Sequence, residues 1–336
     1  MKCWMRSIRI ELISEKNGQK MVFGDDPNKL EQTRKYKYGI PQPTINDALS
    51  IKINGSKYAA TNKDKGTISI YNLTYETITK IIIGEYYKIK IYCGYKSIGA
   101  PMCIFSGSVA YISPRIYSNH DKECYIIFTS DLVARYSQNR MRLTLNSGIN
   151  LFAAINYMML SQGANTYHID ENLKNAFVNE IKDYYNSAST ILDSATLSNT
   201  GSYDISTDGT DGNVIDVTTI KGKRIIEIKK DSIPIGSGNP TVSSDGLHIN
   251  LFPVRNFKPG DILHVDNSLI DVSISNAESV ISTFNTNYMD TNGFYMIITL
   301  NYNLENRGDN FQYEITARAL DIIQKIRGWH NGGQEW

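Results

Sequence analysis

The side chains that could do chemistry in this chain are scattered rather than grouped. Hydrolysis needs an activated nucleophile or two carboxylates at a working distance, and the sequence has no Gly-x-Ser-x-Gly, His-Glu-x-x-His or phosphate-loop motif. His248 and His264 fall in predicted strands, where each imidazole is expected to be half-buried or at the surface. We therefore predict no catalytic residue, no cofactor and no enzymatic activity.

One segment has the spacing of a cation-binding loop. Asp204-Ile-Ser-Thr-Asp208-Gly209 places oxygen ligands at loop positions one, three and five, with glycine at position six, as calcium loops do. Position twelve is Ile215, where such a loop supplies a bidentate glutamate. We expect a solvated turn here, with a weak cation site near Asp204–Asp208 as the alternative.

The four cysteines do not form a metal-binding pattern. Cys3, Cys93, Cys103 and Cys124 show no Cys-x-x-Cys spacing and have no neighbouring histidine pair. Structural metal sites normally need such spacing. The pattern therefore favours reduced structural thiols and predicts no metal site.

Composition argues against a strongly charged partner. Lysine plus arginine total 35 and aspartate plus glutamate total 34, so no net field draws the chain to nucleic acid or to an anionic membrane. The segment Met1 to Ile13 lacks the apolar core of a secretory signal, and no run of about 18 apolar residues occurs. We expect a protein that is made and kept in a cytosol, that contacts DNA, if at all, only by passage, and that has no stable membrane association.

Alternating apolar residues predict strands in the first third of the chain. The positions that give each run one apolar face are Ile8, Ile10 and Leu12, then Leu49, Ile51 and Ile53, then Ile68 and Ile70, and then Ile89 and Ile91. Between two of these runs, Thr74 as N-cap and Gly84 as the C-terminal stop predict one short helix. Further strands are expected at 86–93, 103–113 and 123–130. Six or so short strands with one helix predict a closed or nearly closed antiparallel barrel.

The pattern changes near Ser147. Helical spacing is found over Ile149 to Ser161 and over Glu171 to Leu192. In the second of these helices, the stripe formed by Leu173, Phe177, Ile181 and Tyr184 is expected to face a barrel. Residues 194–213 are rich in Ser, Thr, Gly, Asp and Asn and predict a linker or long loop.

Strands return after the linker, so the chain is predicted to be mainly β with an α insert, an α+β protein. The predicted domains are a first β-barrel domain at 1–140, a helical insert and linker at 141–213, a second β-barrel domain at 214–320 and a C-terminal tail at 321–336. The tail is too short to form a core of its own. Trp329 and Trp336 are its candidate interaction residues, because exposed tryptophan on a terminus is costly unless a partner covers it.

Two stretches resemble the baseplate hub or tail hub proteins of tailed phages, which are related to components of contractile injection systems. The first stretch comprises Ile68 to Thr77, Ile83 to Tyr95 and Ile104 to Ile112, and the second comprises Gly238 to Pro240, Gly246 to Pro253, Phe257 to Leu263 and Gly293 to Gly308. The matches cover roughly two thirds of the chain in the expected order. Tyr302 and Asn306 stand where the family usually has His and Asp. These two departures argue against an enzymatic role but not against a structural one.

The resemblance implies a homotrimer in which each subunit gives two barrel-like tube domains to a ring around a central channel. It implies a structural hub in the virion tail tip that binds the tail tube or distal tube protein, the spike or central fibre, and other baseplate proteins. Two alternatives stay open. One is a tail-tip peptidoglycan hydrolase, and the other is a host-glycan-binding module suggested by the 22 tyrosines.

A trimer presents six equivalent surfaces to a hexameric tube only if each subunit contributes two similar ones. We therefore predict that the β regions at about 6–135 and 214–318 superpose as two copies of one barrel. Two unrelated β domains are the alternative, since the sequence shows no detectable repeat.

Overall fold

The structure is a computed structural model that describes residues 6–25, 36–37, 40–41, 49–58, 64–116, 122–130, 140–146, 148–150, 152–153, 156–157, 167–169, 182–187, 204–207, 215–218, 223–243, 245–271 and 289–320. These residues are mostly antiparallel β-sheet, and α2 is the one complete α-helix among them. Within the same residues, no helix is long and apolar enough to span a membrane.

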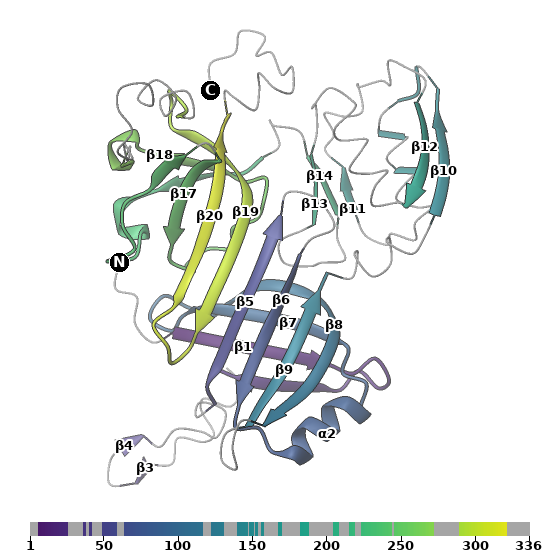
Figure 1. The fold of residues 1–336 in the computed structure, drawn as a ribbon, viewed down its shortest axis with the longest axis vertical. Helices are drawn as coiled ribbons and strands as arrows, with labels where there is room; N and C mark the ends of the chain where they lie inside the picture. Colours follow the sequence, from purple (N-terminus) through teal and green to yellow (C-terminus); the bar gives the residue numbers. More distant parts are fainter. Residues whose placement is uncertain are drawn as a thin grey trace.

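The first half of the sheet comes from the N-terminal part of the chain. Its strands are β1 (Arg6–Ile13), β2 (Lys20–Gly24), β5 (Ile51–Tyr58), β6 (Lys65–Tyr71), β7 (Lys88–Tyr95), β8 (Met102–Ile116) and β9 (Lys122–Thr129). In Figure 1, β1 and β7 run across β5, β6 and β9 rather than along them, so the bent sheet covers one core from two sides. The predicted alternation is confirmed, because Ile10, Ile53, Ile68 and Ile91 are all fully buried.

The predicted short helix is α2 (Tyr75–Ile83), and it has the expected ends. Thr74 is the N-cap, and its side chain accepts a hydrogen bond from the Thr77 backbone N–H. Gly84 is the C-cap, with its N–H donating to the Lys80 carbonyl at 2.9 Å. The helix follows β6 and precedes β7 in the chain. Its Ile78 and Ile81 side chains are buried in the hydrophobic core.

The second half comes from the C-terminal part of the chain. Its strands are β15 (Ile225–Ile228), β16 (Thr241–Ser243), β17 (Gly246–Leu251), β18 (Ile262–Val265), β19 (Phe294–Glu305) and β20 (Phe311–Ala319), with 3-10 turns η3 (Lys230–Ser232) and η4 (Asn267–Leu269) between them. The two halves form one sheet because β5 pairs with β19 from Thr299 to Glu305 (Figure 1). Buried side chains of both halves belong to one hydrophobic cluster.

Apart from β2, which pairs with β1 at the end of the sheet, the two halves have the same strand order. It is β1-β7-β8-β9-β6-β5 in the first half and β15-β18-β19-β20-β17-β16 in the second. Corresponding neighbours are antiparallel throughout, except that β15 and β18 are parallel whereas β1 and β7 are antiparallel. Even a bulge recurs, between Val109 and Tyr111 in β8 and between Ile297 and Thr299 in β19.

In the middle of the chain, the structure corrects the prediction of a helical insert. Short strands lie here: β10 (Arg140–Leu145), β11 (Tyr167–Ile169), β12 (Lys182–Ser187), β13 (Asp204–Thr207) and β14 (Ile215–Thr218). Residues 152–153 and 156–157 are helical, as predicted, but Tyr184 lies in β12, which pairs with β10. Tyrosine favours strands, and Asn and Ser disfavour helix interiors, so strand pairing prevails over the helical spacing. Leu173, Phe177 and Ile181 lie outside the described residues.

Two further two-residue strands, β3 (Tyr36–Lys37) and β4 (Ile40–Pro41), pair with each other. They lie apart from the main sheet (Figure 1).

Candidate interaction surface

One face of the joined sheet carries polar side chains in rows that run directly across the strands. Asn250 of β17, Glu314 of β20, Asn301 of β19, Ser56 of β5 and Lys65 of β6 are successive register partners in one row. A second row contains Gln312, Asn303, Asn54 and Thr67. Each row crosses from the second half to the first without interruption.

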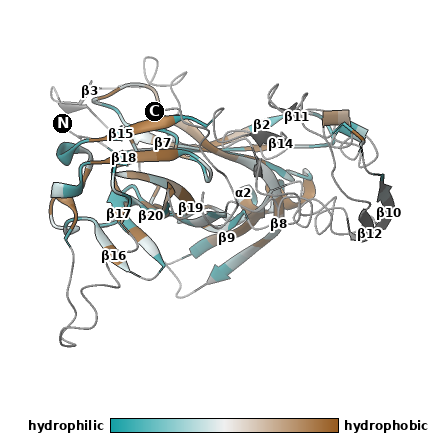
Figure 2. Ribbon diagram, turned by 90° about the horizontal axis from the view of Figure 1, so that it is seen from above, coloured by the Kyte–Doolittle hydropathy of each residue, from teal (hydrophilic) through white to brown (hydrophobic). Residues whose placement is uncertain are grey.

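The opposite face of the same strands is buried. Its matching row contains Tyr313, Tyr302, Gly55, Gly66 and Phe128, and both tyrosines and Phe128 are at most 1% exposed. Strand alternation puts successive residues on opposite faces, so the polar rows follow from the buried ones. The sheet is therefore amphipathic over both halves. Figure 2 shows hydrophilic and hydrophobic residues within the same strands.

Two shallow depressions lie on the polar face and meet at Asn301 and Glu314. One of about 490 Å³ is lined by β16, β17 and β20 residues such as Thr241, His248 and Asn250. The other, of about 730 Å³, is lined by β5, β6 and β19 residues. Amides and hydroxyls dominate both linings. The charged side chains are Asp271 and Glu314 in the first depression and Lys65 and Glu314 in the second. Such a surface offers no strong binding to either a polyanion or a polycation.

His264 has its Nδ1 2.8 Å from the Glu227 carboxylate and its ring stacked on Phe294, whereas His248 lies between two hydroxyls. The Nε2 of His248 lies 2.9 Å from the Ser243 hydroxyl, and its Nδ1 lies 3.3 Å from the Thr316 hydroxyl. A serine hydrolase orients its histidine with a carboxylate at Nδ1, whereas a neutral hydroxyl stands at His248. The Ser243 hydroxyl also accepts the Asp245 N–H at 3.2 Å, so this cluster fixes the β16–β17 hairpin.

The junction between the two halves is held by polar contacts from a single turn. Asn306 donates from Nδ2 to the Leu49 carbonyl at 2.9 Å and accepts the Ile51 N–H through Oδ1 at 2.8 Å. The Arg6 guanidinium donates to the carbonyls of Glu305 and Asp309, each at 3.2 Å. These bonds connect β1 and β5 of the first half to the β19–β20 turn of the second.

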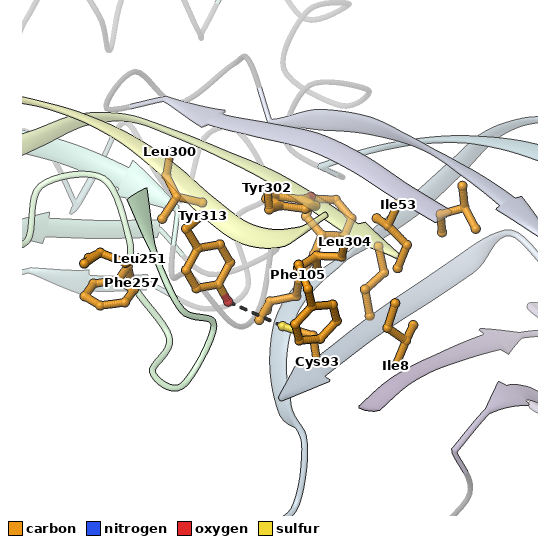
Figure 3. Packing of buried hydrophobic residues seen from close by; sticks show 14 of the residues in the cluster. Ile8, Ile53, Cys93, Phe105, Leu251, Phe257, Leu300, Tyr302, Leu304 and Tyr313 are labelled. Carbon is orange, nitrogen blue, oxygen red and sulfur yellow. Dashed lines mark hydrogen bonds between the residues drawn. The ribbon is translucent and has the colours of Figure 1, made fainter. Parts of the chain in front are cut away.

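Aromatic packing seals the same junction beneath the sheet (Figure 3). Any Cβ added to Gly55 would lie 2.3 Å from the Tyr302 ring, so the ring occupies the space that only glycine leaves. Tyr313 of the second half and Cys93 of the first are 3.5 Å apart, hydroxyl to sulfur. Burial raises the pKa of the Cys93 thiol to about 12, so this thiol is neutral at physiological pH.

Elsewhere in the second half, Arg224 and Asp261 form an ion pair at 2.5 Å that connects the entry of β15 to that of β18. Burial of the carboxylate raises the pKa of Asp261, although Arg224 opposes this shift. The pair is structural, because Asp261 also accepts the Lys258 N–H at 2.9 Å in the turn before β18.

The predicted site residues have different outcomes. Trp329 and Trp336 lie outside the described residues. Asp204 to Thr207 form strand β13, so the predicted solvated turn is wrong for these four residues. The alternation of Ile205 with Ser and Thr favours the observed strand. Asp208 lies outside the described residues, and no group of three metal-binding side chains occurs among those that are described.

Other expectations can be compared directly. His248 and His264 lie in strands β17 and β18, as predicted. Cys93, Cys103 and Cys124 are free thiols, whereas Cys3 lies outside the described part of the chain. The sequence did not reveal the role of Tyr302 and Asn306, although their departure from the family pattern had singled them out.

The fold defines a class of mostly antiparallel β proteins with two halves of matching strand order in one sheet. It is the fold of phage tail proteins of known structure. The 43 kDa tail protein of prophage MuSo2 from Shewanella oneidensis aligns with a TM-score of 0.54 at 7% identity, over 95% of this chain and 98% of that one. The tail protein from Neisseria meningitidis MC58 aligns with a TM-score of 0.55 at 9% identity, over 96% and 99%.

At the sequence level, no family model matches the chain, and no curated protein matches it. The likeness is therefore one of fold.

Proposed function

We propose that this chain is a structural hub subunit of a phage tail tip, without enzymatic activity, in which three copies form a ring between the hexameric tail tube and the threefold spike or central fibre. The observation that carries the proposal is the matching strand order of the two halves. Three copies of a chain with two similar halves offer six similar elements to a sixfold partner and keep threefold symmetry for the spike. The similarity in fold to two tail proteins supports the same role.

In this proposal the two halves are the two tube domains, and the polar face of the joined sheet lines the channel. Its amides and hydroxyls extend over both halves, with Lys65 and Glu314 as charges of opposite sign in one row. A near-neutral wall does not hold DNA, which suits passage rather than binding. DNA is then a partner only in transit.

The ring would close through strand edges. β18 pairs with β19 at Phe294 to Met296, and β5 pairs with the next part of β19, from Thr299 to Glu305. β8 is the counterpart of β19 in the first half. β7 pairs with one edge of β8 as far as Ser108, and among the described residues no strand pairs with that edge beyond Val109. β16 corresponds to β5 and ends the path of the sheet. The outer side of β16 already carries a bridge between Thr241 and Asp271. Unpaired edges invite pairing, so the β8 edge of one copy would pack against the next copy in the ring.

The remaining partners follow from the position of such a ring. We propose that it contacts the tube or distal tube protein on one side, the spike or central fibre on the other and neighbouring baseplate proteins around it. The subunit would be assembled in the host cytoplasm and would remain in the virion tail tip. Trp329 and Trp336 stay candidate contact residues for these partners.

The mass of the purified full chain in solution, measured at increasing concentration, tests the proposal. A trimer, seen in negative stain as threefold rings, is the expected result. A chain that stays monomeric up to about millimolar concentration contradicts it. Incubation with bacterial cell walls tests the absence of activity, and a loss of turbidity that one Asp or Glu substitution abolishes would support the hydrolase instead.

A further inference from the structure

Helix α2 carries apolar side chains on its outer face as well as on the face that packs against the core. Tyr75, Thr79, Ile82 and Ile83 lie at positions i, i+4, i+7 and i+8 of the helix, which is the spacing of a single face, and we call them the α2 stripe. Tyr75, Ile82 and Ile83 are 46%, 45% and 71% exposed. Exposed apolar side chains gathered on one helix face mark an interaction surface.

The α2 stripe lies on the side of the sheet away from the face that the proposed function assigns to the channel. Ile78 and Ile81 of α2 belong to the same hydrophobic core as Tyr302 and Phe128, the buried residues beneath the polar face. The helix therefore covers the core side of the sheet, beside β8 (Figure 1), whereas the polar rows lie on the opposite side. A partner that binds the α2 stripe would lie outside the lumen of the ring.

Among the described residues, α2 has no counterpart in the second half. The strands that flank it, β6 and β7, correspond to β17 and β18. The connection between β17 and β18 is residues 252–261, all of which are described, and it contains no helix. A ring of three copies would thus carry three α2 stripes, whereas features shared by both halves would be present six times. A sixfold partner such as the tube would meet the stripe at only every second subunit, so the stripe suits a partner present in three copies.

The chemistry of the stripe favours an amphipathic helix as its partner. Side chains at this spacing form a ridge that packs between the apolar side chains of a second helix. The rim of the stripe is charged, because the Lys122 ammonium lies 4.7 Å from the centre of the Tyr75 ring, and Lys80 pairs with Glu76 at 2.7 Å along the helix. The Lys122 charge favours an acidic residue on the partner at the Tyr75 end.

We infer that the α2 stripe binds an amphipathic helix of a neighbouring baseplate protein, one copy per subunit and three per ring, on the outside of the ring. This inference rests on the proposed function. The two similar halves would serve the hexameric tube, and α2 would supply a threefold surface that the repeated strands do not provide.

Thiol labelling of an Ile83→Cys variant tests this inference in the purified trimer and in assembled tails, with the wild type as background for the native thiols. The introduced thiol should react rapidly with a maleimide in the trimer and at least about tenfold more slowly in the tail, because the partner helix buries this position. Ile98→Cys is the matched control, since Ile98 is a 45% exposed isoleucine of the same half, in the turn at the other end of β7. Its labelling rate should change by no more than about threefold, and equal slowing of both variants would contradict the inference.

A second variant tests the energetic role of the stripe. Ile82→Ser combined with Ile83→Ser should leave the mass of the trimer unchanged but lower its incorporation into tails by about tenfold or more, because each buried isoleucine contributes about that much to binding. Full incorporation of this variant would overturn the inference.

The remaining outcomes separate this inference from the proposed function. Slow labelling of Ile83→Cys already in the purified trimer would mean that a second copy covers the stripe, and rapid labelling in tails would mean that nothing does. Protection by anionic phospholipid vesicles, with rapid labelling in tails, would assign the stripe to a membrane. Each of these results overturns the inference alone, whereas a wild-type chain that stays monomeric overturns the proposed function and the inference together. If Ile83→Cys does not fold, Ile82→Cys gives the same readout.

Discussion

At the scale of single residues, the contact between Gly55 and Tyr302 decides whether the two halves can join. A side chain at position 55 meets the ring at 2.3 Å, and both residues belong to the buried row beneath the polar face. We predict that Gly55→Ala lowers the free energy of unfolding by about 1–3 kcal/mol, as overpacking usually does. Urea denaturation measures this.

The neighbouring substitution Ser56→Ala is the control, because Ser56 points to the polar face and its loss should cost less than about 0.5 kcal/mol. In a Tyr302→Leu background the cost of Gly55→Ala should shrink, since the clash is with the ring. Equal costs in both backgrounds would disprove the steric explanation.

The Asn306 side chain joins the two halves by two hydrogen bonds. It satisfies one donor of β5 and one carbonyl just before it, at 2.8 and 2.9 Å. Asn306→Ala should cost about 1–3 kcal/mol of unfolding free energy, because it leaves partly buried backbone groups without their partner. Asn301→Ala, on the polar face of β19, should change stability little in the same denaturation experiment. A small effect at both positions would mean that water replaces the amide.

The buried thiols predict a loss of stability in alkali. Burial raises the pKa of Cys93 and of Cys124 from 9.0 to about 12. The raised values mean that the folded state holds these protons when the unfolded state has released them, so stability falls as pH rises from about 9 to 12. Each thiol contributes up to about 1.4 kcal/mol per pH unit in that window.

Cys124→Ala should therefore reduce the slope of unfolding free energy against pH in this window, measured by urea denaturation. In the folded wild type, both thiols should resist alkylation at pH 8 and should react after unfolding. An unchanged slope together with rapid alkylation would show that the thiols are accessible.

At the scale of elements, α2 shows where local signals suffice. The Thr74 cap bonds the Thr77 N–H at 3.2 Å, and Glu76 and Lys80 form an i,i+4 pair at 2.7 Å. We predict that Thr74→Ala costs about 1 kcal/mol of unfolding free energy, as the loss of an N-cap does. Thr79→Ala, at an exposed position inside the helix, should be neutral or slightly stabilising. The opposite order of effects would contradict the capping role.

The elements also show why the sequence predicted some of the fold and missed the rest. The strands around Ile10, Ile53 and Ile91 were predictable because strict alternation has one structural meaning. The strand at Tyr184 was not, since a short aromatic segment suits either period and its partner β10 is about forty residues away in the chain. The pairing of β5 with β19 joins residues more than 240 positions apart, for which no local signal exists.

At the scale of the whole molecule, the repeated strand order could not be read from sequence, because the two halves place different residues on the same scaffold. Position 302 is tyrosine in β19 and its counterpart in β8 is Pro114. What the two halves share is the positions of their buried residues. Phe128 of β9 and Ala317 of β20 lie opposite the bulges, and Ile126 and Ile315 lie two residues earlier in the same strands. Fold is thus retained where side-chain identity is not, which also explains 7–9% identity to tail proteins that align over nearly the whole chain.

The most direct test of the hub proposal is a three-dimensional reconstruction, by cryo-electron microscopy, of the assembled subunit or of the tail tip that contains it. The proposal predicts a threefold ring in which both halves of every subunit border one channel, with Asn54, Asn301 and Asn303 facing its lumen. A subunit present as a monomer, or a ring in which only one half borders the channel, would contradict the proposal.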